Sequence, residues 1–108
     1  MRASLEEKEV DELLRLVAWR EKGRLCTVQD IQILYISCPN FGLMKPPLLV
    51  IHGFPISSFD FWKVYNGLTE QFDIFLWDMA GYGFSEKVHR TICEQVDILQ
   101  ALFRKLNY

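Results

Sequence analysis

Two short apolar runs organise the middle of the chain, at residues 48–51 (LLVI) and 73–77 (DIFLW). Neither run alternates with polar residues, which is typical of strands covered on both faces, as in parallel sheets. The segment between them is long enough for the crossover helix that two parallel neighbours require. The loops that follow the runs, residues 52–55 and 78–85, leave the carboxyl ends of the predicted strands, where open α/β sheets bind ligands. The pattern therefore predicts an α/β fold with a functional crevice at these two loops.

The N-terminal stretch has apolar residues at helical spacing up to Trp19, namely Val10, Leu13, Leu14 and Val17. Ser4 and Glu7 have the spacing of a capping box, which indicates a helix start, and Gly23 is a plausible stop. We expect this helix to lie against the sheet. It forms the first predicted unit, residues 1–22, and residues 23–108 form the second.

Between that helix and the first apolar run, residues 25–28 and 31–36 are rich in β-forming residues. They are joined at Gln29-Asp30, and Asp tolerates the left-handed geometry of a tight hairpin. After residue 55, Ser57 or Ser58 can begin one helix that carries Phe61, Val64, Tyr65 and Leu68 on a single face.

The last element is a helix that begins at a second capping box, Thr91 and Glu94, and ends near Asn107. Its apolar stripe is predicted to consist of Ile92, Val96, Leu99, Phe103 and Leu106. The expected order is therefore helix, hairpin, strand, helix, strand, helix.

Composition narrows the possible functions. A chain of 108 residues with a net charge of -2 forms one domain at most, and it has no basic stripe for nucleic acid. The charged N-terminus is not a signal peptide and no run approaches the ~18 apolar residues of a membrane span, so an intracellular protein is expected. Cys26, Cys38 and Cys93 form no C-x-x-C pair, which favours reduced thiols over a redox or metal role. No cofactor and no metal site is predicted.

The first loop reads His52-Gly53-Phe54-Pro55. A histidine is the usual general base at neutral pH, but no nucleophile can be assigned to it here, so His52 is interpreted as bracing the loop through hydrogen bonds. Gly53 permits a sharp turn and close approach of amides to a ligand, and Pro55 stiffens the exit. The chemical group that this loop offers is the backbone N–H of Phe54.

The second loop carries Asp78, Gly81, Gly83 and Ser85. Its serine follows the second glycine, so it is not the G-x-S-x-G nucleophile elbow, and Glu86 replaces the third glycine of a dinucleotide-binding loop. Ser85 is therefore a poor candidate nucleophile. All four residues are predicted to structure the loop, with Asp78 accepting hydrogen bonds from its amides.

Taken together, the H-G-F-P loop and the segment D-x-x-G-x-G-x-S resemble the N-terminal part of an α/β-hydrolase, in particular the epoxide hydrolases and haloalkane-dehalogenase-like proteins. Residues 46–55, 57–60, 67–69 and 83–87 resemble the mesoderm-specific-transcript-like branch of that family. The resemblance implies a mainly parallel sheet of strand order 1-2-4-3-5-6-7-8. This chain would supply strands 1 to 4, a partial sheet made of a hairpin and two parallel strands, truncated before the nucleophile strand.

The same resemblance implies that Phe54 supplies one of two oxyanion-hole amides, and that nucleophile, acid and base lie downstream of Tyr108. The chain contains no G-x-S-x-G and no His-Asp-x-Gly elbow. We therefore expect it to be inactive alone, as a fragment of a parent that hydrolyses a small-molecule ester or epoxide. The exposed strand from Leu48 to Ile51 is expected to promote self-association. The membrane association implied for the relatives rests on a hydrophobic N-terminal segment that this chain replaces with a charged helix.

Two alternatives remain open on the sequence. A short product can retain the half-fold as a non-catalytic interaction module. An unrelated α/β nucleotide-binding protein is disfavoured by the broken glycine pattern at residues 81–86.

Overall fold

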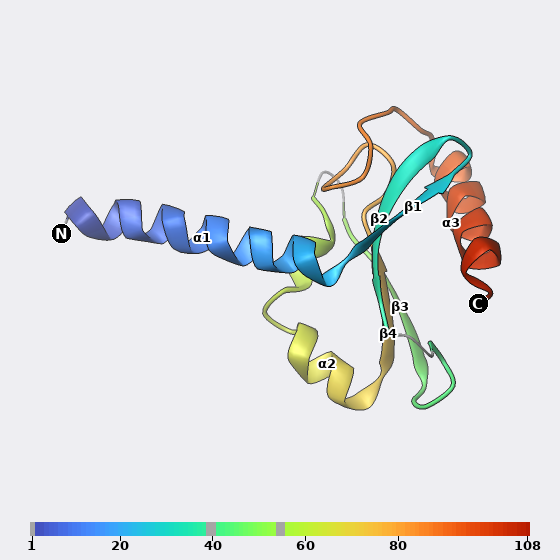
Figure 1. Ribbon diagram of the computed structural model, residues 1–108, viewed down its shortest axis with the longest axis horizontal. Coiled ribbons are helices and arrows are strands. Elements are labelled where there is room, and N and C mark those ends of the chain that lie inside the picture. The colour runs from blue at the N-terminus through green and yellow to red at the C-terminus, as the bar shows by residue number, and fades with distance from the viewer. Residues whose placement is uncertain (1, 39–40, 54–55) are drawn as a thin grey trace.

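The computed structural model describes residues 2–38, 41–53 and 56–108, with side chains from residue 6 onward. Its core is an open four-stranded sheet of order β1-β2-β4-β3 (Figure 1). The strands are β1 (Arg24–Val28), β2 (Ile31–Ser37), β3 (Pro47–Ile51) and β4 (Asp73–Trp77). The helices are α1 (Arg2–Lys22), α2 (Tyr65–Gln71), α3 (Ile92–Leu106) and the 3-10 helix η1 (Ser58–Phe61).

The predicted hairpin is confirmed. β1 and β2 pair antiparallel, with Val28 opposite Ile31, and the two residues between them both have left-handed backbones. The φ angles are 51° at Gln29 and 62° at Asp30, the conformation that matches the twist of a two-residue hairpin turn. The hairpin joins the rest of the sheet through β2, which pairs antiparallel with β4.

The predicted parallel pair is also confirmed, since β3 and β4 run parallel with Leu49 opposite Phe75. The single helix predicted between them is wrong, because this segment consists of η1 and a separate seven-residue α2. Ser57 caps η1 by accepting a hydrogen bond from the Phe59 amide, but Val64 offers α2 no side-chain cap. Asn66 and Gly67 are weak helix formers, which limits α2 to its short length.

Each face of the sheet has its own apolar core. Ile33, Phe75 and Trp77 pack with Ile98 and Leu102 of α3 on one face. On the other face, Ile36, Ile74 and Leu76 pack with Trp19 and with aromatic residues of the η1–α2 segment. Figure 1 shows the sheet between α3 on one side and, on the other, α2 and the C-terminal end of α1. β4 is therefore buried along its whole length, as predicted.

β3 departs from the prediction of a strand covered on both faces, and agrees with the exposed edge strand that the family resemblance implies. It lies at the edge of the sheet, where its residues alternate between exposed and half-buried. Leu49 and Ile51 are 38% and 55% exposed. Hydropathy alone did not distinguish a central strand from an apolar edge strand, because both consist of uninterrupted apolar residues.

α3 begins and ends as predicted. Thr91 accepts from the Glu94 amide and the Glu94 carboxylate accepts from the Thr91 amide, and Asn107 closes the helix with φ of 62°. The predicted apolar stripe is wrong at its N-terminal end, although Leu99, Phe103 and Leu106 are half-buried and pack against the core as predicted. The buried line consists of Gln95, Ile98 and Leu102, whereas Ile92 and Val96 are 75% and 50% exposed. The apolar residues of α3 cover a broad side of the helix. The sheet contacts one part of that side and leaves the part with Ile92 and Val96 in solvent.

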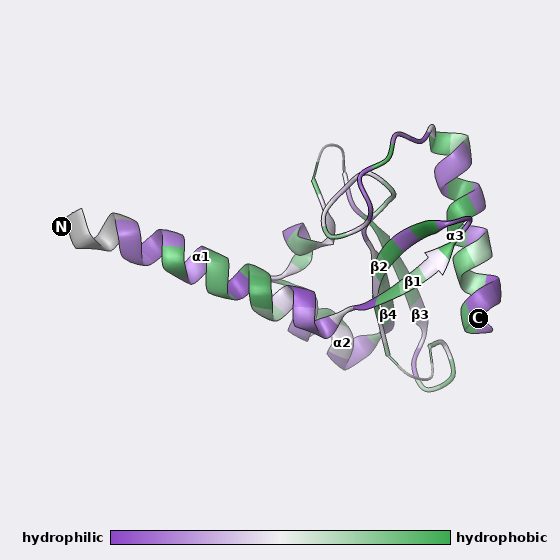
Figure 2. Ribbon diagram, turned by 45° about the horizontal axis from the view of Figure 1, so that its top comes forward, coloured by the Kyte–Doolittle hydropathy of each residue, from purple (hydrophilic) through white to green (hydrophobic). Residues whose placement is uncertain are grey.

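α1 does not lie against the sheet, so that prediction is wrong. It projects from the body, and only its last turns contact the remainder of the chain (Figure 1). The helix already begins at Arg2, so Ser4 lies inside it and does not mark its start, while its end at Lys22 agrees with Gly23 as the stop. Bands of apolar and polar residues alternate along it (Figure 2). Within the part of the chain that the structure describes, no helix is long and apolar enough to cross a membrane.

Candidate functional site

His52 lies directly after β3 with its ring buried. Its Nε2 accepts a hydrogen bond from the Met79 amide at 3.0 Å, and its Nδ1 lies 2.9 Å from the carbonyl oxygen of Gly53. A nitrogen that accepts from an amide carries no proton, so the neutral ring is protonated at Nδ1 and donates to Gly53. The ring also packs edge-on against Tyr82. These contacts tie the two loops together and leave the imidazole without a free basic nitrogen.

Asp78 follows β4 and is completely buried. Its Oδ1 accepts from the Ser58 amide at 2.8 Å, and its Oδ2 accepts from the Phe84 amide at 2.9 Å. One carboxylate thereby connects the start of η1 with the second glycine loop. A buried carboxylate needs such donors, since an unpaired buried charge is strongly unfavourable.

Ser85 is buried between the second loop and the hairpin. Its hydroxyl donates to the Asp78 carbonyl oxygen at 2.5 Å and accepts from the Leu34 amide at 2.8 Å. A serine nucleophile is activated by a hydrogen bond to a general base. Ser85 instead donates to a backbone carbonyl, which fits the predicted loop-structuring role and not a nucleophilic one.

The two glycines of this loop meet steric requirements that other residues do not satisfy. Gly81 has φ of 94°, and a Cβ there would lie 2.5 Å from the carbonyl oxygen of Val88. Gly83 has φ of 53°, and a Cβ there would collide with the Asp78 carboxylate. Gly53, by contrast, is outside the left-handed region, and a Cβ there would meet no atom of the described residues within 4 Å.

Gln95 is a loop-positioning residue that sequence reasoning missed. Its side-chain oxygen accepts from the Ala80 amide at 3.1 Å, and its side-chain nitrogen donates to the Ala80 carbonyl at 2.8 Å. The side chain is buried on the sheet-facing side of α3. A polar residue inside an apolar helical arc was the available signal, because buried polar groups almost always have hydrogen-bond partners.

Phe54 and Pro55 lie outside the described residues, so the predicted oxyanion amide stays a prediction. The surrounding geometry is nevertheless well defined, since the carboxyl ends of β3 and β4 lie side by side and His52 joins their loops. Among the described residues, no group of three or more His, Cys, Asp or Glu side chains is placed to hold a metal ion.

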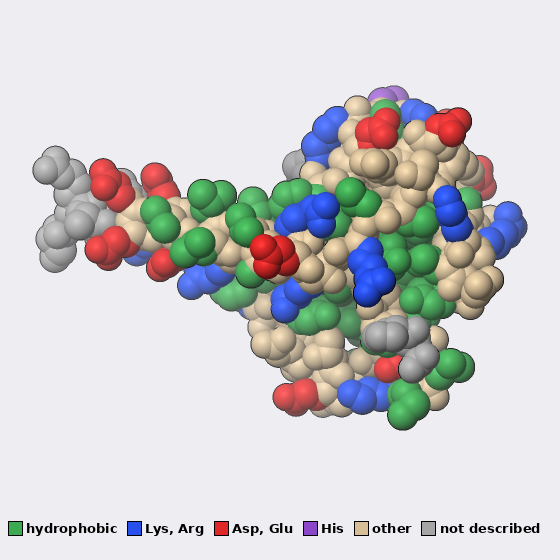
Figure 3. Space-filling model, in the orientation of Figure 1, with side chains coloured by type: hydrophobic (Ala, Val, Ile, Leu, Met, Phe, Trp, Pro, Cys, Tyr) green, Lys and Arg blue, Asp and Glu red, His purple; other side chains and the backbone are tan. Residues whose placement is uncertain are grey.

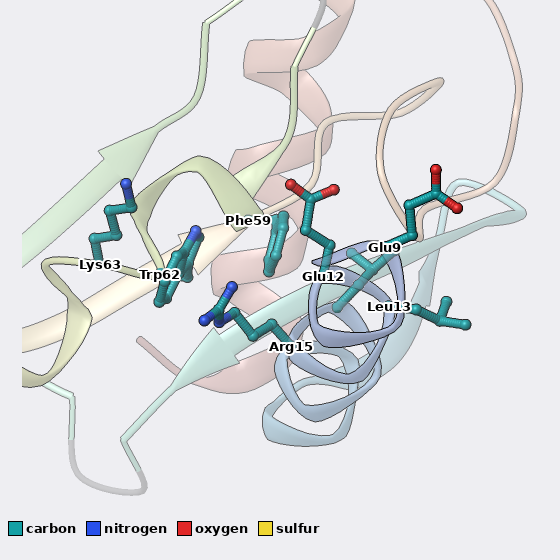
Figure 4. Close-up of a pocket in the computed structure, with 8 residues that line it drawn as sticks. Glu9, Glu12, Leu13, Arg15, Phe59, Trp62 and Lys63 are labelled. Atoms are coloured by element: carbon teal, nitrogen blue, oxygen red, sulfur yellow. The ribbon is translucent and has the colours of Figure 1, made fainter. Parts of the chain in front are cut away.

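A separate cleft of about 710 Å³ lies between α1 and η1. Figure 4 shows the indole of Trp62 and the ring of Phe59 on one wall, with Arg15 of α1 beside Trp62. The guanidinium carbon of Arg15 is 4.8 Å from the Trp62 ring centroid. None of the loop residues described above lines this cleft, so it is separate from the two loops that follow β3 and β4.

Comparison with known proteins identifies the fold and its family. Residues 46–107 match the family model of the alpha/beta hydrolase fold. The chain is 37% identical over 97 residues to the mesoderm-specific transcript homolog protein of Homo sapiens, an alignment that covers 84% of this chain and 28% of the relative. The chain belongs to the α/β-hydrolase family.

Two further relatives extend the likeness within the α/β-hydrolases. Epoxide hydrolase 1 of Oryctolagus cuniculus is 32% identical over 69 residues, 53% of this chain and 15% of the relative. The haloalkane dehalogenase DatA of Agrobacterium tumefaciens C58 superposes with a TM-score of 0.66 at 25% identity, covering 80% of this chain and 29% of that structure. The resemblance stated from the sequence is confirmed, and the chain spans less than a third of the length of these relatives.

The observed strand order β1-β2-β4-β3 is the order expected for the first four strands of an α/β-hydrolase sheet. β3, which in that order would be followed by the next strand, forms an open edge here. The polar side chains in the described part of these loops, His52, Asp78 and Ser85, are accordingly all held in hydrogen bonds.

Proposed function

We propose that the chain is the N-terminal part of a hydrolase that acts on a small-molecule ester or epoxide. Its contribution is one oxyanion-hole donor, the Phe54 amide, carried on the loop after β3. The observation that supports this proposal most directly is the hydrogen bonding of His52 and Asp78, which holds the loops on both sides of the crevice. A preorganised backbone donor stabilises developing negative charge because it needs no reorganisation during the reaction.

The nucleophile in this proposal comes from residues outside the 108. No G-x-S-x-G or His-Asp-x-Gly elbow is present in the sequence, and the hydroxyl of Ser85 and the imidazole of His52 are both occupied. The likeness to an epoxide hydrolase and to a haloalkane dehalogenase supports hydrolytic chemistry but leaves ester and epoxide substrates as equal candidates.

The first test is an assay of the purified 108-residue chain with p-nitrophenyl acetate and with styrene oxide. The expected rate is that of buffer alone, because a single oxyanion donor without a nucleophile does not cleave either substrate. Turnover that is abolished by Ser85→Ala or His52→Ala would contradict the proposal.

The second test follows the reading frame past the Tyr108 codon in the transcript. A continuing frame that encodes a strand and then a Ser or Asp elbow is expected. In that longer protein, Phe54→Pro removes the proposed amide and should lower kcat by about 10²–10³, whereas Phe54→Leu keeps the amide and should retain most activity. Equal activity of the two variants would refute the role of Phe54.

A non-catalytic interaction module is the second candidate. The observation that favours it is the open edge of β3, which presents unpaired backbone groups that can receive another strand. A stop codon after Tyr108 in an abundant transcript, together with absent turnover, would favour the module over the hydrolase part.

A further inference from the structure

The projecting part of α1 carries an apolar stripe that nothing in the described chain covers. Val10, Leu13, Leu14 and Val17 are 54%, 59%, 61% and 46% exposed. Figure 3 shows hydrophobic side chains grouped along the helix on the face turned toward the viewer. In Figure 4 the Leu13 side chain, at the rim of the neighbouring cleft, points away from Trp62.

The base of α1 is firmly anchored, which keeps this stripe away from the sheet. Trp19 is 3% exposed and donates from its indole nitrogen to the Ser58 hydroxyl at 3.0 Å. Its ring contacts Tyr65 and Phe59 edge-on, at centroid distances of 5.3 and 6.1 Å. The face that carries Trp19 is therefore used for attachment, and the stripe occupies a different side of the helix.

A helix of 21 residues that contacts the body only at its end has little tertiary support. Isolated helices shorter than about 12–15 residues are marginal in water, which is roughly the length of the projecting part of α1, and most helical stability in proteins comes from packing of an apolar face. The positions of Val10, Leu13 and Val17 follow the i, i+3, i+7 spacing of a two-helix seam. Both features favour a second helix as the occupant of the stripe.

The charges along α1 identify which helix fits. Residues 6–12 carry five acidic side chains and one lysine, a net charge of -4. Residues 15–22 carry Arg15, Arg20 and Lys22 against Glu21, a net charge of +2. A second copy of α1 in antiparallel orientation places the acidic half of each helix beside the basic half of the other. A parallel pair would instead oppose like charges.

We propose that two copies of this chain pair through α1 as an antiparallel, two-fold symmetric helix pair. Val10 of each copy lies against Val17 of the other, and Leu13 and Leu14 meet at the centre. Glu9 and Arg20 border the stripe on the same flank, so the antiparallel arrangement brings Glu9 of one copy near Arg20 of the other. The interface is isologous, since both copies use the same patch, and it places the two folded bodies toward opposite ends of the pair.

Sedimentation velocity of the full chain across a concentration series tests the pairing. The expected result is a reversible monomer–dimer equilibrium. Leu13→Glu and Leu14→Glu should each weaken the dimer by about tenfold or more, because each change places two charges in the apolar seam. Leu43→Glu is the control, since Leu43 is 79% exposed in a loop, and it should leave the dimer unchanged. Far-UV circular dichroism of the variants checks that they remain folded.

Charge reversal tests the orientation. Glu9→Lys and Arg20→Glu should each weaken the antiparallel dimer, and mixing the two variants should restore it, because both cross-pairs are then of opposite charge. A parallel pair would be unaffected by either single reversal, because like charges face each other before and after the change. Reversals without effect would therefore overturn the antiparallel assignment.

Two further outcomes would overturn the proposal as a whole. One is a chain that stays monomeric throughout the concentration series. The other is a dimer that survives Leu13→Glu but is lost on Ile51→Lys, which would place the contact at the open edge of β3 and not at α1.

Discussion

Asp78 and Gly83 show how individual residues define the second loop. The Asp78 carboxylate occupies the space where a side chain on residue 83 would have to lie, and its Oδ2 accepts from the next amide, that of Phe84. Gly83 also has a left-handed backbone, which side chains other than glycine rarely adopt. Loop shape and carboxylate position therefore depend on each other.

Replacing Gly83 with alanine should destabilise the fold by about 2 kcal/mol or more, because the methyl group meets a buried carboxylate and the backbone is strained. Gly67→Ala is the matched control. Gly67 lies inside α2 with open space around it, so this change should stabilise by about 0.5–1 kcal/mol. Urea unfolding followed by circular dichroism measures both. A neutral Gly83→Ala variant would contradict the role assigned to Asp78.

Asp73 plays a similar part at the opposite end of β4. Burial alone would raise the pKa of its carboxyl, but hydrogen bonds from the amides of Lys45, Met44 and Gly42 and from Cys38 outweigh burial and lower the pKa below 3.8. The amides of Met44 and Lys45 both lie 3.1 Å from its Oδ2. The ionised form therefore holds the loop that leads into β3.

This depressed pKa makes the stability of the fold dependent on pH in the acid range. The contribution of Asp73 is fully present above pH 3.8 and is lost as pH falls through the lower pKa of the folded state, because protonation removes the negative charge that strengthens these hydrogen bonds. Asp73→Asn should be less stable at neutral pH and should lose less stability on acidification. Urea midpoints at stepped pH values test this, and equal acid slopes for both proteins would argue against it.

At the scale of elements, α1 and α3 show the limit of apolar periodicity. In both, the spacing identified a helix correctly, but the residues that become fully buried are not those of the predicted stripe. α3 turns Gln95, Ile98 and Leu102 toward the sheet, whereas Trp19 is the one fully buried side chain among residues 6–22 of α1. Spacing defines an apolar arc, whereas the position of the neighbouring sheet selects a line within it.

Alanine substitutions in α3 test this selection. Ile98→Ala removes a fully buried side chain and should destabilise by about 2–5 kcal/mol. Ile92→Ala, at a position 75% exposed on the same helix, should change stability by less than about 0.5 kcal/mol. Denaturant unfolding of the two variants compares them directly. A similar loss of stability in both variants would indicate that Ile92 is buried, as the sequence predicted.

The whole molecule is extended for its size. Its radius of gyration is 15.1 Å, and a compact domain of this length has about 13 Å. The projecting α1 accounts for the longest dimension of 50 Å (Figure 1). A second exposed region is the edge of the sheet at β3. There Leu49 and Ile51 leave apolar surface and unpaired backbone groups in solvent. Exposed apolar edges of this kind promote strand-to-strand association.

Lysine at this edge should slow aggregation. Leu49→Lys and Ile51→Lys place a charge on the open strand, and both should reduce the growth of light scattering when the chain is held at elevated temperature. Ile92→Lys adds the same charge on α3, away from the edge, and should have a smaller effect. Equal protection by all three variants would indicate a general charge effect and not an edge contact.

Features that depend on a few neighbouring residues were predictable from the sequence. The turn at Gln29-Asp30, the Thr91 capping box and the Asn107 cap each involve groups within four residues of one another. The buried strand 73–77 and the loop motifs were also recognisable, and they carried the family resemblance. A hydrogen bond or φ preference over such short separations is largely independent of the remainder of the fold.

Features that depend on distant partners required the tertiary structure. His52 is held by Met79, 27 positions away, and Ser85 is held by Leu34, 51 positions away. The partner of Gln95 and the projection of α1 could not be inferred locally, because the position of the neighbouring sheet decides which parts of each helix are covered. Turns and helix caps follow from short-range hydrogen bonds and backbone preferences. The roles of His52, Ser85 and Gln95 follow from packing between segments far apart in the chain.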